Sequence, residues 1–206
     1  MDPRDLGALR AALGASAVLM VDANQALAPD AALELSRAAA PFDPVWLEEP
    51  LRVDAPAADW RASAAASPIP LAGGENPRGA DLDGAVAGEV LHVVQPDATK
   101  WGGVTGTIAV ARAAVGRGKP FCPHVFGGGV ALLASLHLSA AAGGDGLLEF
   151  DCHLNAGREL VIASLLPVGR GHVPVPQGAG IGAVPDIGAL DRYRSWPPRR
   201  WRDRRA

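Results

Sequence analysis

The stretch VWLEEP (residues 45–50) places two adjacent carboxylates, Glu48 and Glu49, directly after a short apolar run. Like charges repel, so the pair is either an ordinary exposed strand end or part of a site that needs one carboxylate at a fixed place. Successive side chains of a strand point to opposite faces, so only one of the two can face a shared interior. Whether other apolar runs end in the same way decides between these interpretations.

Short apolar runs recur along the whole chain, and most are separated by alanine-rich segments with helical periodicity. Helical segments are predicted over 28–40, 104–118 and 129–144, and the first begins with Pro29 and Asp30, which suit a first turn. Strands that alternate with helices of this length indicate βαβ units and a parallel sheet. The six runs are VLMV (18–21), VWL (45–47), IPLA (69–72), LHVVQ (91–95), PFCP (120–123) and LLEF (147–150).

An ionisable residue lies at or just beyond the end of each apolar run. Consecutive members of this set are 22 to 27 residues apart, which is about the length of one βα unit. In a (β/α)8 barrel the carboxyl ends of the strands converge on one mouth, where the chemistry takes place. The repeat therefore favours one shared site, made by Asp22, Glu48, Glu75, Asp97, His124 and Glu149.

The predicted fold class is α/β, as an incomplete TIM-type (β/α) barrel of about six βα units. A full barrel has eight strands and about 250 residues, whereas this chain has 206 residues. A helical pattern at 5–14 leads into the first visible strand, so we expect the two remaining strands to precede residue 1. The partial barrel is expected to span 1–194, and the arginine-rich end at 195–206 to be a flexible tail.

Composition narrows the possible partners. The net charge of −3 gives no reason to expect nucleic-acid or membrane binding by the body of the protein. No run approaches the roughly 18 apolar residues that a bilayer crossing needs. The two cysteines make no disulfide framework, so we expect a reduced, cytoplasmic setting.

Three of the strand-end acids, Asp22, Glu48 and Glu75, follow consecutive predicted strands. Three carboxylates in one cleft cannot all remain charged and unpaired. An all-oxygen set suits a hard divalent cation with positions left for water or substrate, so Mg²⁺ is the first choice and Mn²⁺ the second. Zinc is disfavoured, because the Cys/His pairs at 122/124 and 152/153 depart from the usual ligand spacing.

Asp97 and His124 lie one βα unit apart, on neighbouring predicted strands. An aspartate that accepts a hydrogen bond from a histidine fixes its tautomer and raises its basicity, which makes a general base. Glu149 lies across the predicted mouth, where it suits an acid or a hydrogen-bond donor. A metal beside such a base suggests removal of a proton α to a carboxylate, with the metal stabilising the enediolate.

Taken together, these motifs resemble the barrel of the enolase superfamily, closest to its mandelate racemase and acid-sugar dehydratase group. The resemblance runs from about residue 5 to 194. The matching segments are VDANQ (21–25), WLEEP (46–50), GGEN (73–76), QPDATKWGGVTG (95–106), PHVFGGGVALLASLHLSAA (123–141), LEFD (148–151) and VPVPQGAGIGAVPD (173–186).

The resemblance implies a role for each residue that matches a family motif. In this group three carboxylates bind Mg²⁺, a His–Asp pair removes the α-proton, and further polar groups contact the substrate. By this resemblance the metal ligands are Asp22, Glu48 and Glu75, and the catalytic dyad is His124, as the base, with Asp97. Glu149 would hydrogen-bond the substrate carboxylate, Asn24 would contact the substrate, and Lys100 would supply a charge near the site.

Two features of that group do not occur in this sequence: an N-terminal capping domain, and a strand with a Lys-x-Lys or Lys-x-His base. Because one dyad suffices for dehydration, we favour a Mg²⁺-dependent dehydratase, a lyase that acts on a sugar acid or related hydroxy acid. A racemase or epimerase of the same superfamily and a non-catalytic truncated remnant stay open. The expected partner is a small carboxylate substrate, and we expect a homo-oligomer.

Overall fold

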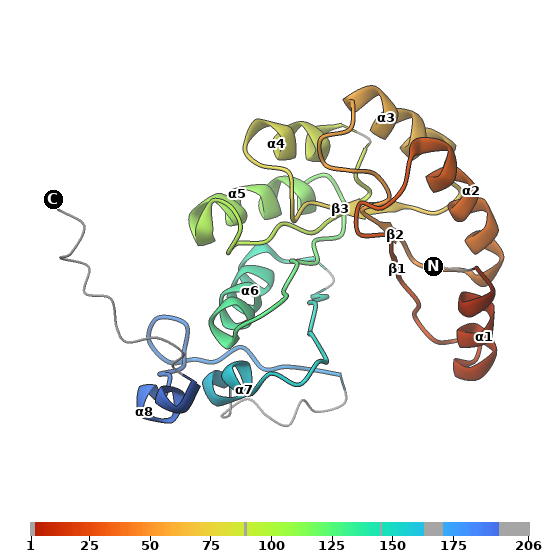
Figure 1. Cartoon of the computed structure of the whole chain (residues 1–206). Helices are drawn as coiled ribbons and strands as arrows, with labels where there is room; N and C mark the ends of the chain where they lie inside the picture. Colours follow the sequence, from red (N-terminus) through yellow and green to blue (C-terminus); the bar gives the residue numbers. More distant parts are fainter. Residues whose placement is uncertain (1–2, 89, 145, 163–170, 194–206) are drawn as a thin grey trace, which may run out of the picture.

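The structure is a computed structural model of the chain, and the residues it describes are 3–88, 90–144, 146–162 and 171–193. Short parallel strands alternate with helices along the chain, and the helices form an arc around the sheet (Figure 1). The strands lie in sequence order and every neighbouring pair is parallel. They are β1 (Val21–Asp22), β2 (Leu47–Glu48), β3 (Leu71–Gly73) and β4 (Val93–Val94). The predicted α/β class with a parallel sheet is confirmed.

The helices follow the predicted segments closely. Among the described residues, the α-helices are α1 (Pro3–Leu13), α2 (Pro29–Ala39), α3 (Ala57–Ala66), α4 (Ala80–Ala87), α5 (Gly103–Val115), α6 (Gly129–Ala142), α7 (Ala156–Ile162) and α8 (Ile187–Leu190). Short 3-10 turns follow at η1 (Ala40–Phe42) and η3 (Asp191–Tyr193). Helix α2 begins at Pro29, whose fixed φ and missing N–H suit the first helical position. No described helix has the length and apolarity that a bilayer crossing requires.

The core lies between the strands and the inner faces of the helices. Val21, Leu47 and Leu71 are almost fully buried, and Leu6 of α1 and Ala39 of α2 belong to the same apolar cluster. Strands of a parallel sheet are covered on both faces, so their sequences are continuous apolar runs without alternation. This burial explains why the runs were recognisable although each strand is only two or three residues long.

The fifth and sixth apolar runs are less regular than the sequence predicted. Phe121 forms a single parallel bridge with Val94, and residues 147–150 form no strand. The sixth run contacts the segment that follows the fifth through a side chain: the Glu149 carboxylate accepts a hydrogen bond from the backbone N–H of Val125, 2.8 Å away. The tail predicted at 195–206 lies outside the described residues.

Candidate active site

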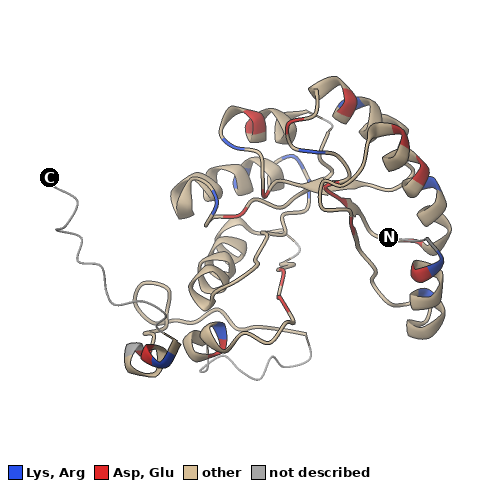
Figure 2. Ribbon diagram, viewed as in Figure 1, with Lys and Arg blue, Asp and Glu red and all other residues tan. Residues whose placement is uncertain are grey.

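Seven of the eight predicted site residues line one cavity of about 940 Å³, at the carboxyl ends of the strands. Figure 2 shows acidic positions at the centre of the arc, where the strands end. The eighth residue, Asp97, is buried and reaches the cavity through His124, which lines it. The structure thus brings together Asp22, Asn24, Glu48, Glu75, Lys100, His124 and Glu149 at this cavity.

The His124 ring is held between two carboxylates. Its Nδ1 lies 3.1 Å from Oδ2 of Asp97, and its Nε2 lies 2.8 Å from Oε2 of Glu75. Burial alone would lower the pKa of His124, but the hydrogen bonds to Asp97 and Glu75 outweigh it and raise the pKa to about 10. In this arrangement the imidazole is protonated at neutral pH.

Asp97 is oriented by the residue two positions after it. Its Oδ1 accepts hydrogen bonds from the backbone N–H and the hydroxyl of Thr99, each at 2.7 Å, which leaves Oδ2 for His124. Burial would raise the pKa of Asp97, but the hydrogen bonds from His124 and Thr99 lower it to about 2. Asp97 is therefore ionised and fixes which nitrogen of His124 faces the cavity.

Glu75 contacts two cationic side chains. One carboxylate oxygen binds both Lys100 Nζ and His124 Nε2, while the other accepts a hydrogen bond from Asn76. Burial would raise the pKa of Glu75, but His124 and Lys100 lower it to about 2. Within the described part of the chain, one group of three side chains has potential metal-ligand atoms that all lie within 4.8 Å of one another. The group is Glu75, Asp97 and His124.

Asp22 and Glu48 are direct neighbours across the β1–β2 register. Together with Glu75 they line the same cavity, so the predicted ligands face one space although they do not form the tightest cluster. Their donor atoms are all carboxylate oxygens, which are the ligands that Mg²⁺ prefers. The residues present therefore fit a hard divalent cation.

Gln95 connects Glu48 to Glu149 through hydrogen bonds, and the sequence did not predict this role. Its amide nitrogen donates to Oε2 of Glu48 at 2.7 Å and to Oε1 of Glu149 at 3.3 Å, and Trp46 donates to the same oxygen of Glu48. Gln95 is fully buried, and its Oε1 has no hydrogen-bond partner in the described structure. The sequence does contain an indication of this role, because Gln95 is a polar residue at the end of the apolar run 91–95.

Two further predicted residues, Glu149 and Asn24, also line the cavity. Burial raises the pKa of Glu149 to about 7, so its carboxyl group can donate a hydrogen bond near neutral pH. Burial likewise raises the pKa of Glu48, partly opposed by the hydrogen bond from Gln95. Asn24 adopts a left-handed backbone with φ of 45°, and its N–H donates to Asp22 at 2.7 Å.

A comparison with family models identifies the chain. A model described as "Enolase C-terminal domain-like" matches residues 1–189, which is most of the sequence. This chain belongs to that family. The resemblance to the enolase superfamily is thereby confirmed.

Curated relatives of this enolase-family chain are sugar-acid enzymes. D-Galactarolactone cycloisomerase of Agrobacterium fabrum is 33% identical over 209 residues, a match that covers 96% of this chain and 54% of the relative. Arabinonate dehydratase of Saccharolobus solfataricus is 27% identical over 195 residues, with 94% of this chain and 52% of the relative covered. The chain spans about half the length of these relatives.

Solved structures of the family have the same fold. A mandelate racemase/muconate lactonizing enzyme from Bordetella bronchiseptica matches with a TM-score of 0.84 and 43% identity, over 92% of this chain and 53% of that one. A racemase from Streptomyces coelicolor, crystallised with bound magnesium, matches with a TM-score of 0.77 and 28% identity, over 93% of this chain and 52% of that one.

Proposed function

We propose that this chain carries the barrel site of a Mg²⁺-dependent acid-sugar dehydratase, which removes the proton α to the substrate carboxylate. The observation that carries this proposal is the His124 ring, bound at Nδ1 by Asp97 and turned with Nε2 toward an acid-lined cavity. Relatives named as dehydratases, such as the L-talarate/galactarate enzyme of Salmonella typhimurium at 37% identity over 142 residues, support this substrate class.

His124 would act as the base through Nε2. Asp97 accepts the hydrogen bond at Nδ1, which leaves Nε2 as the nitrogen able to take a proton from a substrate in the cavity. Without substrate, Nε2 is bound to Glu75, which helps to keep the ring protonated. His124 can therefore act as a base only after Glu75 has changed its partner.

Asp22, Glu48 and Glu75 would hold Mg²⁺, or Mn²⁺ in its place. When bound, the ion would supply a Lewis acid that stabilises negative charge developing on the substrate carboxylate. Glu149 would donate a hydrogen bond to the same carboxylate, because burial keeps its carboxyl group partly protonated. Asn24 and Lys100 line the cavity and would orient a polyhydroxy acid.

The reaction would then proceed by elimination. The electron pair of the α C–H bond forms the double bond of the enol as His124 takes the proton. The β C–O bond breaks next, and the departing hydroxyl would take the proton that His124 has just accepted, so that it leaves as water and His124 returns to its starting state. One base on one face suffices for this sequence, whereas racemisation needs a second base on the other face.

Cycloisomerisation is the second candidate. Two curated relatives carry that name, at 33% and 34% identity, and the second is the 3,6-anhydro-α-L-galactonate cycloisomerase of Streptomyces coelicolor. Such a reaction would use the same abstraction of the α-proton by His124. NMR of the products separates the candidates, because dehydration gives a 2-keto-3-deoxy acid and cycloisomerisation opens or closes a ring.

The test is exchange of the α-proton with deuterated solvent in a panel of sugar acids, followed by NMR in the presence of Mg²⁺. We expect exchange with the native chain and a loss of about 10²-fold or more for His124→Asn. His172→Asn, which changes an exposed histidine outside the cavity, serves as the control and should leave exchange unchanged. Exchange that persists in His124→Asn would assign the base to another residue.

A further inference from the structure

A second histidine with an aspartate partner lines the candidate active site. His153 and Asp151 both belong to the cavity wall, on the segment that follows Glu149. Oδ1 of Asp151 accepts a hydrogen bond from Nδ1 of His153 at 2.7 Å and another from its backbone N–H at 2.9 Å. The proposed dehydration assigns no step to this pair.

Asp151 fixes the proton position on the His153 ring. The hydrogen bonds from His153 lower the pKa of Asp151, so its carboxylate is ionised and only accepts hydrogen bonds. Nδ1 of His153 therefore carries the proton, and in the neutral ring Nε2 is an acceptor. Among the described residues Nε2 has no hydrogen-bond partner, and the side chain is 86% exposed. The ring thus presents one free acceptor at the cavity wall.

A buried arginine holds the turn that carries this pair. Arg158 of α7 is 4% exposed, and its Nη1 lies 2.9 Å from Oδ2 of Asp151. Its Nη2 donates to the backbone carbonyl of His153 at 2.7 Å. Because Arg158 matches the charge of Asp151, that carboxylate is satisfied without a charge on His153. The position of the free acceptor therefore does not depend on a bound metal or substrate.

The His153 ring also contacts the segment of the proposed base. Its centroid lies 6.4 Å from that of the Phe126 ring, and the two planes meet edge to face at 77°. Phe126 lines the same cavity and follows His124 by two residues. The free acceptor therefore lies beside the loop that carries His124.

A sugar acid is long enough to reach from Glu149 to His153. The four residues from Glu149 to His153 span at most about 14 Å when fully extended. A six-carbon acid measures about 8 Å from its carboxylate to its terminal hydroxyl, at about 1.5 Å per C–C bond, and side chains supply further reach. A three-carbon acid measures about half as much and would fall short. The cavity, at about 940 Å³, has room for the longer acid.

We propose that His153 recognises the far end of the substrate, where Nε2 accepts a hydrogen bond from the terminal hydroxyl of a five- or six-carbon monocarboxylic sugar acid. This inference rests on the proposed function, since it takes the reacting carboxylate to lie at Glu149. A second carboxylate at the far end has no proton to donate to Nε2 and would lie beside Asp151. The site therefore discriminates against dicarboxylic sugar acids.

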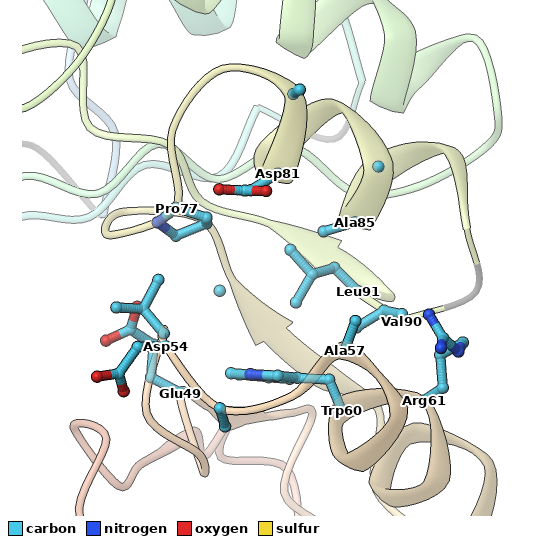
Figure 3. A pocket seen from close by; sticks show the side chains of 16 residues that line it. Glu49, Asp54, Ala57, Trp60, Arg61, Pro77, Asp81, Ala85, Val90 and Leu91 are labelled. Atoms are coloured by element: carbon cyan, nitrogen blue, oxygen red, sulfur yellow. The ribbon is translucent and has the colours of Figure 1, made fainter.

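A separate cavity provides a control for binding elsewhere. It measures about 470 Å³ and lies between α3 and α4 (Figure 3). It shares no lining residue with the candidate active site, and none of its described lining residues is a histidine. Trp60 and Leu91 contribute apolar surface to its wall (Figure 3), which suits a polyhydroxy acid poorly. Asp81→Asn, in this second cavity, should therefore leave sugar-acid binding unchanged.

Ligand-observed NMR with Mg²⁺ present measures binding of three sets of compounds to the 206-residue chain. They are six-carbon aldonic acids, the dicarboxylic acids of the same configuration, and glycerate. His124→Asn is the common background, so that binding is measured without turnover. We expect at least one aldonic acid to bind with a Kd on the order of 1 mM, and its dicarboxylic counterpart to bind about tenfold more weakly.

Substitutions of His153 locate the contact. His153→Asn keeps a polar group near Nδ1 but lacks Nε2, so it should weaken aldonic-acid binding about three- to tenfold and leave glycerate binding unchanged. His153→Gln, whose amide reaches the position of Nε2, should restore most of the affinity. Asp81→Asn and His172→Asn, which lie outside the active-site cavity, are the controls. Unfolding curves confirm that each variant is folded.

Four results would each overturn the proposal. They are unchanged aldonic-acid affinity in His153→Asn, an equal loss for glycerate, equal or tighter binding of the dicarboxylic acid, and no saturation by any aldonic acid at about 50 mM.

Turnover separates this inference from the proposed function. With His124 intact, His153→Asn should raise KM for the aldonic acid and leave kcat within about twofold, because the contact is equal in the ground and transition states. Binding that depends on His153 without any α-proton exchange would contradict the proposed dehydration and support the role of His153. Exchange with unchanged KM in His153→Asn would support the dehydration and overturn the role of His153.

Discussion

At the scale of single residues, neutral side chains orient the carboxylates of the candidate site by donating hydrogen bonds to them. The Gln95 amide joins Glu48 to Glu149, and Thr99 directs Asp97 toward His124. Groups that hydrogen-bond metal-binding carboxylates orient them, and their loss commonly costs 10- to 100-fold in metal affinity. The proposed metal site therefore extends to residues that touch neither metal nor substrate.

Gln95→Met tests this support directly. Methionine has a similar volume but cannot donate to Glu48, so we expect Mg²⁺ affinity to fall by about tenfold, measured by calorimetry. The fold should persist, because the change also removes the unpaired Oε1 acceptor. Gln177→Met, at an exposed position, is the matched control. Unchanged Mg²⁺ affinity in Gln95→Met would show that Glu48 needs no such support.

The sequence predicted which residues line the cavity better than it predicted their partners. The spacing of the strand-end acids predicted Glu48 and Glu75 at one mouth, and both residues line the same cavity. It did not indicate that Glu75 binds His124 and Lys100, since such pairing depends on side-chain rotamers. Thr99 was missed, although an aspartate often bonds to a backbone N–H two residues later.

At the scale of elements, helices α6 and α7 approach each other at a glycine. A Cβ atom at Gly129 would lie 2.6 Å from Cβ of Val161 and 2.8 Å from the carbonyl oxygen of Arg158. No side chain larger than hydrogen fits without a shift of one helix. Helix α6 carries the loop of His124 at its start, so this packing also positions the proposed base.

Gly129→Ala should therefore lower the free energy of unfolding by about 1–3 kcal/mol in urea denaturation, through overpacking. Gly128→Ala is the matched control, because a Cβ atom there would meet nothing within 4 Å. Its effect should stay under about 1 kcal/mol. Equal effects of the two substitutions would show that α7 moves freely to accommodate the methyl group.

Helices and strands were predictable from the sequence where an apolar run is buried and its backbone has a hydrogen-bonding partner. Helix α2 begins at the proline that marked it, and β2 and β3 fall at the ends of their apolar runs. The run at 147–150 is also apolar but forms no strand, and the hydrogen bond from the backbone N–H of Val125 to this segment is accepted by the Glu149 side chain. Apolar composition indicates burial, whereas strand formation also needs a backbone partner.

At the scale of the whole molecule, the acid-rich cavity makes metal-free stability depend on pH. The pKa of His124 is raised from 6.5 to about 10, so its stabilising contribution is complete below pH 6.5 and is lost as pH rises through about 10. The pKa of Glu149 is raised from 4.5 to about 7, so ionising it also costs stability as pH rises. Asp97 and Glu75, with pKa values of about 2, act oppositely below pH 4.

We therefore expect the free energy of unfolding without metal to have its maximum between about pH 4 and pH 6 and to fall toward pH 9. Urea denaturation at pH 3, 5, 7 and 9 measures it. In His124→Asn the decrease between pH 7 and 9 should be smaller than in the native chain. A free energy of unfolding that rises from pH 5 to pH 9 would contradict the charge arrangement described for His124.

Binding of Mg²⁺ is the property on which the proposed chemistry depends most directly. Calorimetric titration of the 206-residue chain with Mg²⁺ at pH 8 tests it, with Glu48→Gln as the ligand variant and Glu34→Gln, an exposed acid of α2, as the control. We predict one saturable site at millimolar or lower Mg²⁺, weakened by about tenfold or more in Glu48→Gln and unchanged in Glu34→Gln. No detectable binding at millimolar Mg²⁺, or equal binding by Glu48→Gln, would contradict a metal-assisted site in this chain.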